Sequence, residues 1–212
     1  TAAAAQGLMP RILARDDAAQ VFLMEHLGGE RVFHLLEASE AHEPWLEQVG
    51  AWLARYHALQ PVEPRSFKPA HNIRRIEQLM HDVSTKRTVV DRDAFLDLAD
   101  RTRQLLPRFA GKPTLAARQH GDLNLHNMIW DGSTLRGLDV TNATMAPIGY
   151  DVARLLMHYS ANLVDHGKLK SGQALPAKAE AAFFRGYTLA GPEDPSIQAI
   201  LRVRILNDWV RF

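Results

Sequence analysis

The sequence predicts an α+β protein with a mostly helical body, a strand pair near its start and a compact strand-and-loop insert near its middle. Three observations lead to this class. Two short apolar stretches, 11–14 and 21–25, flank an acidic pair, which is typical of a hairpin. Several longer segments repeat apolar residues at helical spacing. Residues 115–140 alternate short apolar runs with polar loops, which indicates small strands around functional loops.

The elements follow one another along the chain. Pro44 suits the first position of a helix, and the apolar residues after it recur every three or four positions, so residues 44–59 are predicted to form an amphipathic helix. Pro61, Pro64 and Pro69 then indicate a stiff connection. Further helices are predicted at 72–83, 92–106, 152–163, 178–187 and from 196 onward, and strands at 115–119, 128–130 and 135–140.

The composition excludes several classes of protein. Of the 212 residues, 46% are hydrophobic and 23% charged, with a formal net charge of +1, so there is ample apolar material for a core and no basic excess for a nucleic-acid partner. No apolar run approaches the roughly 20 residues that span a bilayer, so no membrane partner is expected. The chain has no cysteine, which excludes disulfides and favours a reducing compartment. A cytoplasmic location is therefore expected.

A polar loop carries the strongest chemical signal. Asp122 and Asn127 stand five residues apart after His120, and Asp139 follows on the next predicted strand. Phosphoryl transfer from ATP needs one carboxylate that takes the proton of the acceptor hydroxyl, and an amide oxygen and a second carboxylate that hold magnesium. A His-x-Asp-x-x-x-x-Asn loop followed by such an Asp supplies that set. The turn at Asp131-Gly132 is expected to bring the three side chains to one cavity.

Two segments resemble the aminoglycoside phosphotransferase and choline kinase family. They are 22–29 and 120–156, and the His-Gly-Asp-Leu loop is the most specific part, followed by Gly149-Tyr150-Asp151-Val152-Ala153. The resemblance implies a protein-kinase-like fold in which 1–27 form the end of an N-terminal sheet lobe and the hinge. Residues 28–212 would then form a mostly helical C-terminal catalytic lobe with the small strand-loop insert.

The resemblance also implies residue roles. Asp122 matches the catalytic base, and Asn127 and Asp139 match the magnesium ligands that hold the nucleotide. The backbone of Glu25 and Leu27 matches the hinge that hydrogen-bonds adenine. ATP and Mg²⁺ are the implied cofactors, and the implied partner is a small molecule with an acceptor hydroxyl.

Neighbouring residues receive structural roles. Asp151 either braces the loop, as the resemblance implies, or caps its own helix. His120 is expected to be architectural, and Asn124 and His126 to be ordinary loop residues.

Parts of the family pattern are missing before the hinge. The first lysine is Lys68, so no residue can supply the strand lysine that contacts the phosphates. We therefore expect the gene to encode roughly 80–110 further residues before Thr1.

The acceptor stays open between an aminoglycoside, a choline-like compound, a sugar and an amino sugar. Two other functions also stay open: an inactive pseudokinase that senses nucleotide or acts as a scaffold, and a helical binding domain in which the loop match is accidental.

Overall fold

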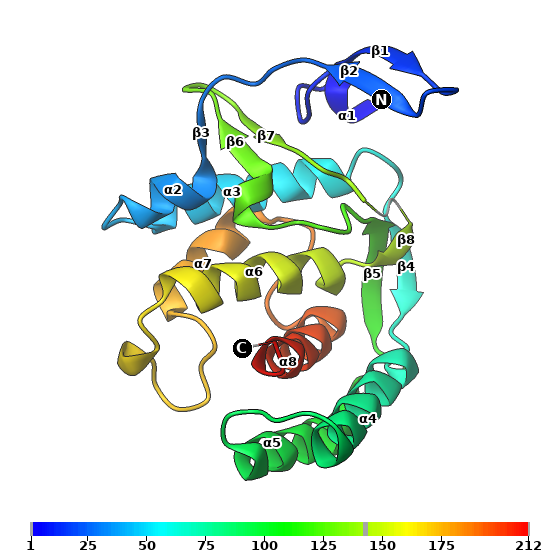
Figure 1. Cartoon of the computed structure of the whole chain (residues 1–212), viewed down its shortest axis with the longest axis vertical. Helices are drawn as coiled ribbons and strands as arrows, with labels where there is room; N and C mark the ends of the chain where they lie inside the picture. Colours follow the sequence, from blue (N-terminus) through cyan, green and yellow to red (C-terminus); the bar gives the residue numbers. More distant parts are fainter. Residues whose placement is uncertain (1, 142–143, 212) are drawn as a thin grey trace.

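The computed structural model describes residues 2–141 and 144–211, and helices dominate it (Figure 1). The helices are α1 (Ala2–Ala5), α2 (Val32–Glu37), α3 (Glu43–His57), α4 (Ala70–Thr85), α5 (Arg92–Leu105), α6 (Gly149–Leu163), α7 (Ala177–Gly186) and α8 (Pro195–Trp209). The strands are β1 (Ile12–Asp16), β2 (Val21–Met24), β3 (Glu30–Arg31), β4 (Glu63–Ser66), β5 (Pro113–Arg118), β6 (Met128–Trp130), β7 (Leu135–Gly137) and β8 (Met145–Pro147). None of the described helices is long and apolar enough to cross a bilayer.

The strands form three small antiparallel sheets. β1 and β2 make the hairpin that lies at the top of Figure 1. In the second sheet β6 lies between β3 and β7, and in the third β5 lies between β4 and β8. Because β5 and β6 belong to different sheets, the chain between them must cross from one sheet to the other. That crossing segment is the polar loop that the sequence singled out.

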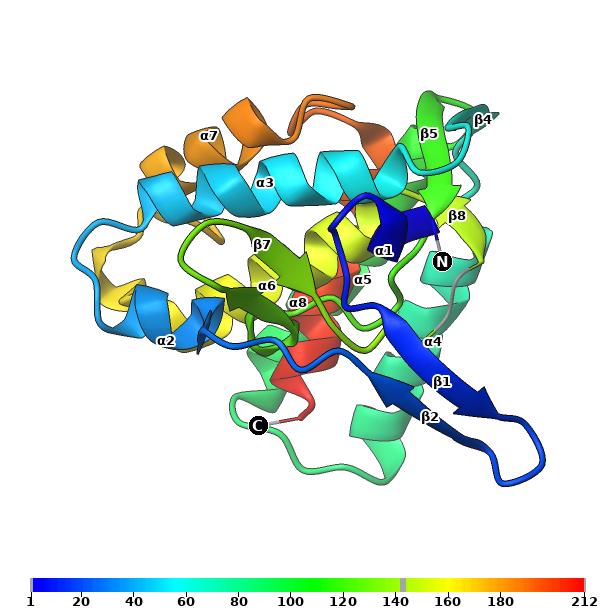
Figure 2. The ribbon, with the colours of Figure 1, turned by 90° about the horizontal axis from the view of Figure 1, so that it is seen from above.

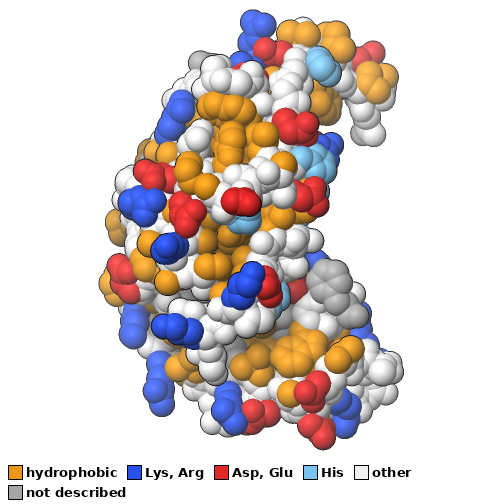
Figure 3. Space-filling model, turned by 90° about the vertical axis from the view of Figure 1, so that its left-hand side faces the viewer, with side chains coloured by type: hydrophobic (Ala, Val, Ile, Leu, Met, Phe, Trp, Pro, Cys, Tyr) orange, Lys and Arg blue, Asp and Glu red, His pale blue; other side chains and the backbone are white. Residues whose placement is uncertain are grey.

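The hairpin projects from the rest of the protein. Its large apolar side chains are exposed, and Phe22 is 63% exposed. In Figure 3 the hairpin overhangs a face that is hollowed beneath it. An isolated two-stranded hairpin is marginally stable in water, so its anchoring to the body matters. The anchors include hydrogen bonds to the Leu8 carbonyl from the Gly137 N–H (2.8 Å) and from Trp52 Nε1 (3.1 Å), and an ion pair between Arg136 and Glu25 (3.2 Å).

The larger core joins α3, α6 and α7 to the polar loop. Helices α3 and α7 run side by side, as seen from above in Figure 2. Their backbones touch at two glycines: a Cβ on Gly186 would lie 1.9 Å from the Glu47 carbonyl oxygen, and one on Gly50 would lie 2.2 Å from that of Phe183. Side chains at these positions would push the helices apart. The loop takes part in the same core, because Leu123 and Leu125 are fully buried in it.

A second core joins α4, α5 and α8. Phe95 and Leu206 are fully buried in it, and Ala153 brings in one face of α6. The two cores therefore meet along α6 and α8. This places the side chains of α4, α6 and α8 around one space below the loop.

Most predicted elements are present, and two corrections follow from backbone pairing. The prolines of the predicted stiff connection do not prevent a strand, because Pro64 lies in β4 at the edge of its sheet, opposite Leu115. The strand predicted at 135–140 ends at Gly137. There the Leu138 N–H turns to the Asn127 carbonyl (2.8 Å) and Asp139 takes a positive φ of 58°. α2 and β8 were not predicted, since both are too short to show a period.

Candidate active site

The loop between β5 and β6, residues 120–127, is shaped by its own polar side chains. The Asn124 carboxamide oxygen accepts from the N–H groups of His126 (3.0 Å) and Asn127 (3.2 Å), as a capping side chain does. Its Nδ2 donates back to the Asp122 carbonyl at 3.1 Å. Asn124 is thus the loop residue expected from the sequence, and it fixes the distance between positions 122 and 127.

Asn127 and Asp122 are in direct contact. Asn127 Nδ2 donates to the Asp122 carbonyl oxygen (2.9 Å) and lies 3.4 Å from the Asp122 carboxylate Oδ2. With its nitrogen engaged in this way, the amide oxygen of Asn127 is turned away from Asp122. That oxygen accepts no hydrogen bond within the described part of the chain, so it is available as a ligand.

Asp139 is brought next to this pair by the backbone. The Leu138 N–H donates to the Asn127 carbonyl, so the residue after Leu138 stands beside the loop. Among residues 2–141 and 144–211, no hydrogen bond or ion pair engages the Asp139 carboxylate. Carboxylate and amide oxygens are the ligands that Mg²⁺ takes alongside phosphate oxygens and water. Asn127 and Asp139 therefore fit a magnesium ion in donor chemistry.

Asp139 faces a cavity of about 530 Å³ beneath the hairpin, here called the hairpin cavity. Apolar side chains of the hairpin and of the helical body line it, including Phe22 and Met24 of β2 and Tyr56 of α3. Asp122 and Asn127 are not among the described residues that line it. The structure thus places Asp139 at the cavity and Asp122 beyond the cavity's edge.

The predicted hinge residues, Glu25 and Leu27, follow directly after β2, whose Phe22 and Met24 line the hairpin cavity. The Glu25 N–H is used inside the hairpin, where it donates to the Arg11 carbonyl at 2.8 Å. The Glu25 carbonyl and the Leu27 N–H are hydrogen-bonded to no described residue. A hydrogen bond from the Arg11 N–H holds the pKa of the half-buried Glu25 carboxyl below its usual value, and Arg136 adds to this effect. The segment after β2, held in place through Glu25, therefore offers one hydrogen-bond acceptor, the Glu25 carbonyl, and one donor, the Leu27 N–H.

A buried network holds the loop from below. Asp151, in the first turn of α6, accepts from the backbone N–H groups of His120 (2.6 Å) and Gly121 (3.1 Å) and hydrogen-bonds His57 Nε2 (3.1 Å). The other ring nitrogen of His57 hydrogen-bonds the hydroxyl of Tyr187 (2.8 Å). Burial alone would raise the pKa of Asp151, but the His57 contact and the two backbone donors hold it below its usual value. Asp151 therefore braces the loop and does not cap α6, whose N-cap position is Ile148, with no side-chain capping hydrogen bond.

The two loop histidines have structural surroundings. His120 is fully buried, with its ring 6.1 Å from that of Trp52 and 5.7 Å from that of Tyr56. Burial lowers its pKa, so the ring is neutral near pH 7. His126 stacks on Phe33 with ring centroids 4.0 Å apart. These placements agree with the structural roles expected for both.

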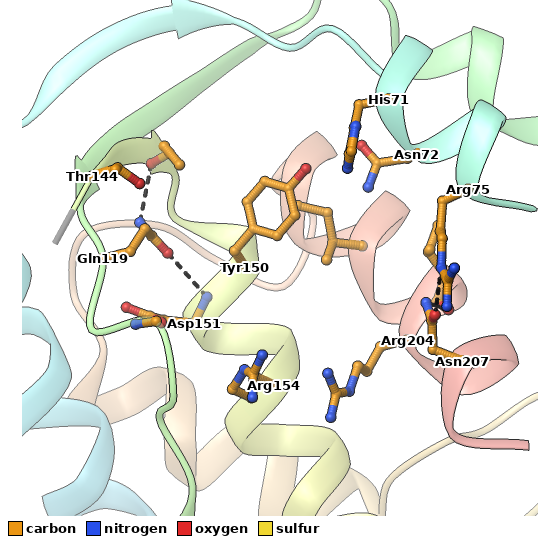
Figure 4. Close-up of a pocket in the computed structure, with 14 residues that line it drawn as sticks. His71, Asn72, Arg75, Gln119, Thr144, Tyr150, Asp151, Arg154, Arg204 and Asn207 are labelled. Atoms are coloured by element: carbon orange, nitrogen blue, oxygen red, sulfur yellow. Dashed lines mark hydrogen bonds between the residues drawn. The ribbon is translucent and has the colours of Figure 1, made fainter. Parts of the chain in front are cut away.

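A second cavity, of about 400 Å³, lies between α4, α6 and α8 and is here called the helix cavity (Figure 4). It adjoins the loop through Gly121 and Arg154, and Arg154 Nη1 donates to Asp122 Oδ1 at 2.7 Å. Asp151 supplies its acidic lining. A cationic acceptor would require an acidic pocket, and the other acidic side chains of the helical body that were candidates to form one are absent from the described lining. Those candidates are Glu43, Glu47, Asp165, Glu180, Glu193, Asp194 and Asp208.

A family model described as the phosphotransferase enzyme family matches residues 1–195. The chain belongs to this family. No curated protein matches the sequence significantly. The matched range includes the 120–127 loop and the α6 segment around Asp151.

Solved structures similar to this family member are small-molecule kinases. A glucosamine kinase in complex with glucosamine, ADP and inorganic phosphate is 20% identical, with a TM-score of 0.61 and coverage of 99% of this chain and 64% of that one. A choline/ethanolamine kinase family protein from Mesorhizobium loti is 18% identical (TM-score 0.61, 99% and 68% covered). An aminoglycoside-3'-phosphotransferase of type VIII is 19% identical (TM-score 0.55, 96% and 76% covered). The predicted protein-kinase-like fold class is confirmed.

The chain spans about two thirds of the length of the first two of these proteins. Their identities lie below 25%, so the likeness concerns the fold. The roles of Glu25, Leu27, Asp122, Asn127 and Asp139, and the division of the chain at residue 27, stay predictions.

Several site residues were missed from the sequence. His57 reaches Asp151 from α3, and Tyr187, at the end of α7, hydrogen-bonds His57. No local pattern marks either residue. Arg154 could have been predicted from the sequence more easily, because it follows Asp151 by three residues and residues at this spacing share a helix face. Arg75 and Arg204, which line the helix cavity with it, come from helices far apart in the sequence.

Proposed function

We propose that the protein is an ATP-dependent phosphotransferase that moves the γ-phosphate of ATP to a hydroxyl of a small molecule. The proposal rests chiefly on one observation, the hydrogen-bonded chain from Asp122 through Asn127 to Leu138, which precedes Asp139. These contacts link the Asp122 and Asn127 side chains to the backbone segment that carries Asp139. Membership of the phosphotransferase family supports the reaction class.

Asp122 is assigned as the general base. Its carboxylate takes the proton of the acceptor hydroxyl as the acceptor oxygen bonds to the γ-phosphorus, while the bond from that phosphorus to the β–γ bridging oxygen breaks and ADP leaves. Asn127 Nδ2 and Arg154 Nη1 hold the carboxylate from two sides. These two donors fix the orientation of the carboxylate toward the acceptor.

Asn127 and Asp139 are assigned to magnesium. The Asn127 amide oxygen and the Asp139 carboxylate would hold the ion, which when bound neutralises phosphate charge. The Glu25 carbonyl and the Leu27 N–H are assigned to the adenine edge, with the apolar walls of the hairpin cavity around the ring. The ADP named in the complex of the similar glucosamine kinase supports a nucleotide of this type.

The acceptor is assigned to the side of the loop where Asp122 faces Arg154. The similar structures are named for glucosamine, choline or ethanolamine, and aminoglycoside. Each of these acceptors carries a hydroxyl, which supports an alcohol group as the acceptor for this chain. We also propose that the enzyme is cytoplasmic and acts on a free small molecule.

Magnesium-dependent release of ADP tests the proposal. Protein expressed from its full reading frame is incubated with ATP, with and without Mg²⁺, and with a panel of alcohols, and ADP is measured by a coupled assay. We expect release that needs both Mg²⁺ and an acceptor and that Asp122→Asn slows by roughly 100-fold or more. Magnesium-dependent ATP binding without release from any acceptor would instead favour the nucleotide-sensing pseudokinase. No nucleotide binding at all would favour an accidental loop match.

A further inference from the structure

The helix cavity carries an unusual concentration of positive charge. Arg75 of α4, Arg154 of α6 and Arg204 of α8 line it together, although they lie far apart in the sequence. Figure 4 shows the guanidinium groups of Arg154 and Arg204 directed toward the same part of the cavity, with Arg75 beside Asn207. Three helices thus contribute one cation each to a space that adjoins Asp122.

Each guanidinium is oriented by the protein but keeps donors to spare. Arg75 Nε donates to Asn207 Oδ1 (2.8 Å) and Arg204 Nε to Asp208 Oδ2 (3.1 Å), while Arg154 uses Nη1 for Asp122. A guanidinium has five N–H donors. No other described residue accepts from Arg75, Arg154 or Arg204, so the remaining N–H groups of all three are available to a ligand.

Two of the three arginines are ion-paired, Arg154 with Asp122 and Arg204 with Asp208, and the described lining adds one further acid. The acid of the described lining is Asp151, whose carboxylate already accepts from His57 and from two backbone N–H groups. The side chains of Arg154 and Arg204 are only 32% and 21% exposed, so water screens them incompletely. Burial lowers the pKa of Arg204. The charge of Asp208 opposes this effect, and the charge of Arg154 adds to it.

We propose that the helix cavity binds an anionic group of the acceptor, so that the substrate is an alcohol that also carries a carboxylate or a phosphate. Arginine forks match the oxygens of both groups in pairs. The inference rests on the proposed function, because it takes Asp122 as the base for the acceptor hydroxyl. Arg154 then has two contacts: one N–H orients the base, and the others face the anion.

The rest of the lining suits the polyol part of such a substrate. His71, Asn72 and Tyr150 stand on the cavity wall (Figure 4) and offer donors and acceptors for hydroxyl groups. A cationic acceptor would meet three guanidinium groups without a spare carboxylate. The cavity therefore distinguishes this chain from an enzyme built for an amine or a quaternary ammonium substrate.

Binding of inorganic sulfate tests the charge preference without a known substrate. Full-reading-frame protein is titrated with sulfate by calorimetry at constant ionic strength, with chloride as the balancing anion. Arg75→Gln and Arg204→Gln are compared with Arg74→Gln, an exposed neighbour on α4, and Arg202→Gln, a residue of α8 outside the cavity lining. We expect sulfate affinity to fall at least about tenfold in the two cavity variants and to stay unchanged in the two controls.

A matched set of sugars tests the substrate class. Glucuronate, glucose and glucosamine share one ring and differ in charge, and their effect on ADP release gives a KM or an inhibition constant for each. We expect glucuronate to bind best and to lose this advantage in Arg204→Gln. Arg204→Lys keeps the charge but not the planar guanidinium, so its preference for glucuronate should lie between that of the wild type and that of Arg204→Gln. This variant also shows whether the position tolerates substitution.

The outcomes separate the two proposals. Sulfate affinity unchanged in both cavity variants, or glucosamine preferred over glucuronate by the wild type, overturns the anionic substrate while leaving the phosphotransferase intact. If no nucleotide chemistry is found but sulfate binds through Arg75 and Arg204, the cavity is an anion site and the proposed reaction is wrong.

Discussion

Asp151 and Arg154 lie three residues apart on α6 and hold the 120–127 loop at two different points. Asp151 accepts the backbone N–H groups of His120 and Gly121, whereas Arg154 donates to the carboxylate of Asp122. Residues three apart share a helix face, so one turn of α6 fixes both the loop backbone and the side chain that we assign as the base. A shift of α6 would move the two together.

The brace beneath the loop should dominate local stability. Asp151→Asn keeps the size of the side chain but removes the charge that His57 and two backbone donors meet. Since hydrogen bonds to a charged group contribute about 1.5–3 kcal/mol each and are not additive, we expect the free energy of unfolding to fall by about 2–4 kcal/mol. Urea unfolding followed by circular dichroism measures this. Asp93→Asn, at an exposed position of α5, is the control; a loss as small as that of the control would contradict the brace.

Substitutions of the three assigned groups should affect turnover and ATP binding differently. In the full-reading-frame protein, Asp122→Asn should cut turnover by roughly 100-fold or more and leave the affinity for ATP–Mg²⁺ nearly unchanged. Asp139→Asn should lose magnesium-dependent ATP binding as well as turnover, because a direct ligand is removed. Asn127→Ala should fall between them. Calorimetry with and without Mg²⁺, beside ADP release, measures both quantities, and the opposite pattern for the two aspartates would reverse the assignments.

The adenine contact should depend on backbone atoms at position 27. Leu27→Pro removes the N–H donor, while Leu27→Ala keeps the donor and shortens the side chain. We expect ATP affinity to fall by about tenfold in the proline variant, the scale of one hydrogen bond left unmade, and by much less in the alanine variant. Fluorescence titration with a labelled ATP analogue compares the two. Equal losses would assign the effect to the side chain rather than to the N–H.

His158 should make the protein sensitive to mild acid. Burial, reinforced by the neighbouring His126 and Arg204, lowers the pKa of His158 to about 4. The unfolded chain takes up this proton near pH 6.5 and the folded protein only near pH 4, so stability should fall as the pH drops between these values. His158→Gln should remove about 1–2 kcal/mol of that fall, a figure reduced for partial solvent screening.

Urea unfolding at pH 4.5 and pH 7 measures the difference, with His81→Gln, an exposed residue of α4, as the control. The same pH dependence in His158→Gln as in the wild type would show that other groups carry it.

Local patterns alone determined much of this protein. Helices α3, α5 and α6 begin close to where apolar periodicity and Pro44 predict, and the polar loop predicted between two short strands lies between β5 and β6. Such features depend on residues within one or two turns of each other, so they can be read along the chain.

Only the tertiary structure decided which distant groups meet. His57 and Asp151 are 94 residues apart, and Arg75 and Asn207 are 132 apart. Periodicity tells which face of a helix is buried but not which helix covers it, because that depends on how the α3, α4, α6, α7 and α8 surfaces pack together. The brace under the loop and the three arginines of the helix cavity arise at those contacts. The substrate preference proposed here therefore rests on packing that no segment of the sequence specifies by itself.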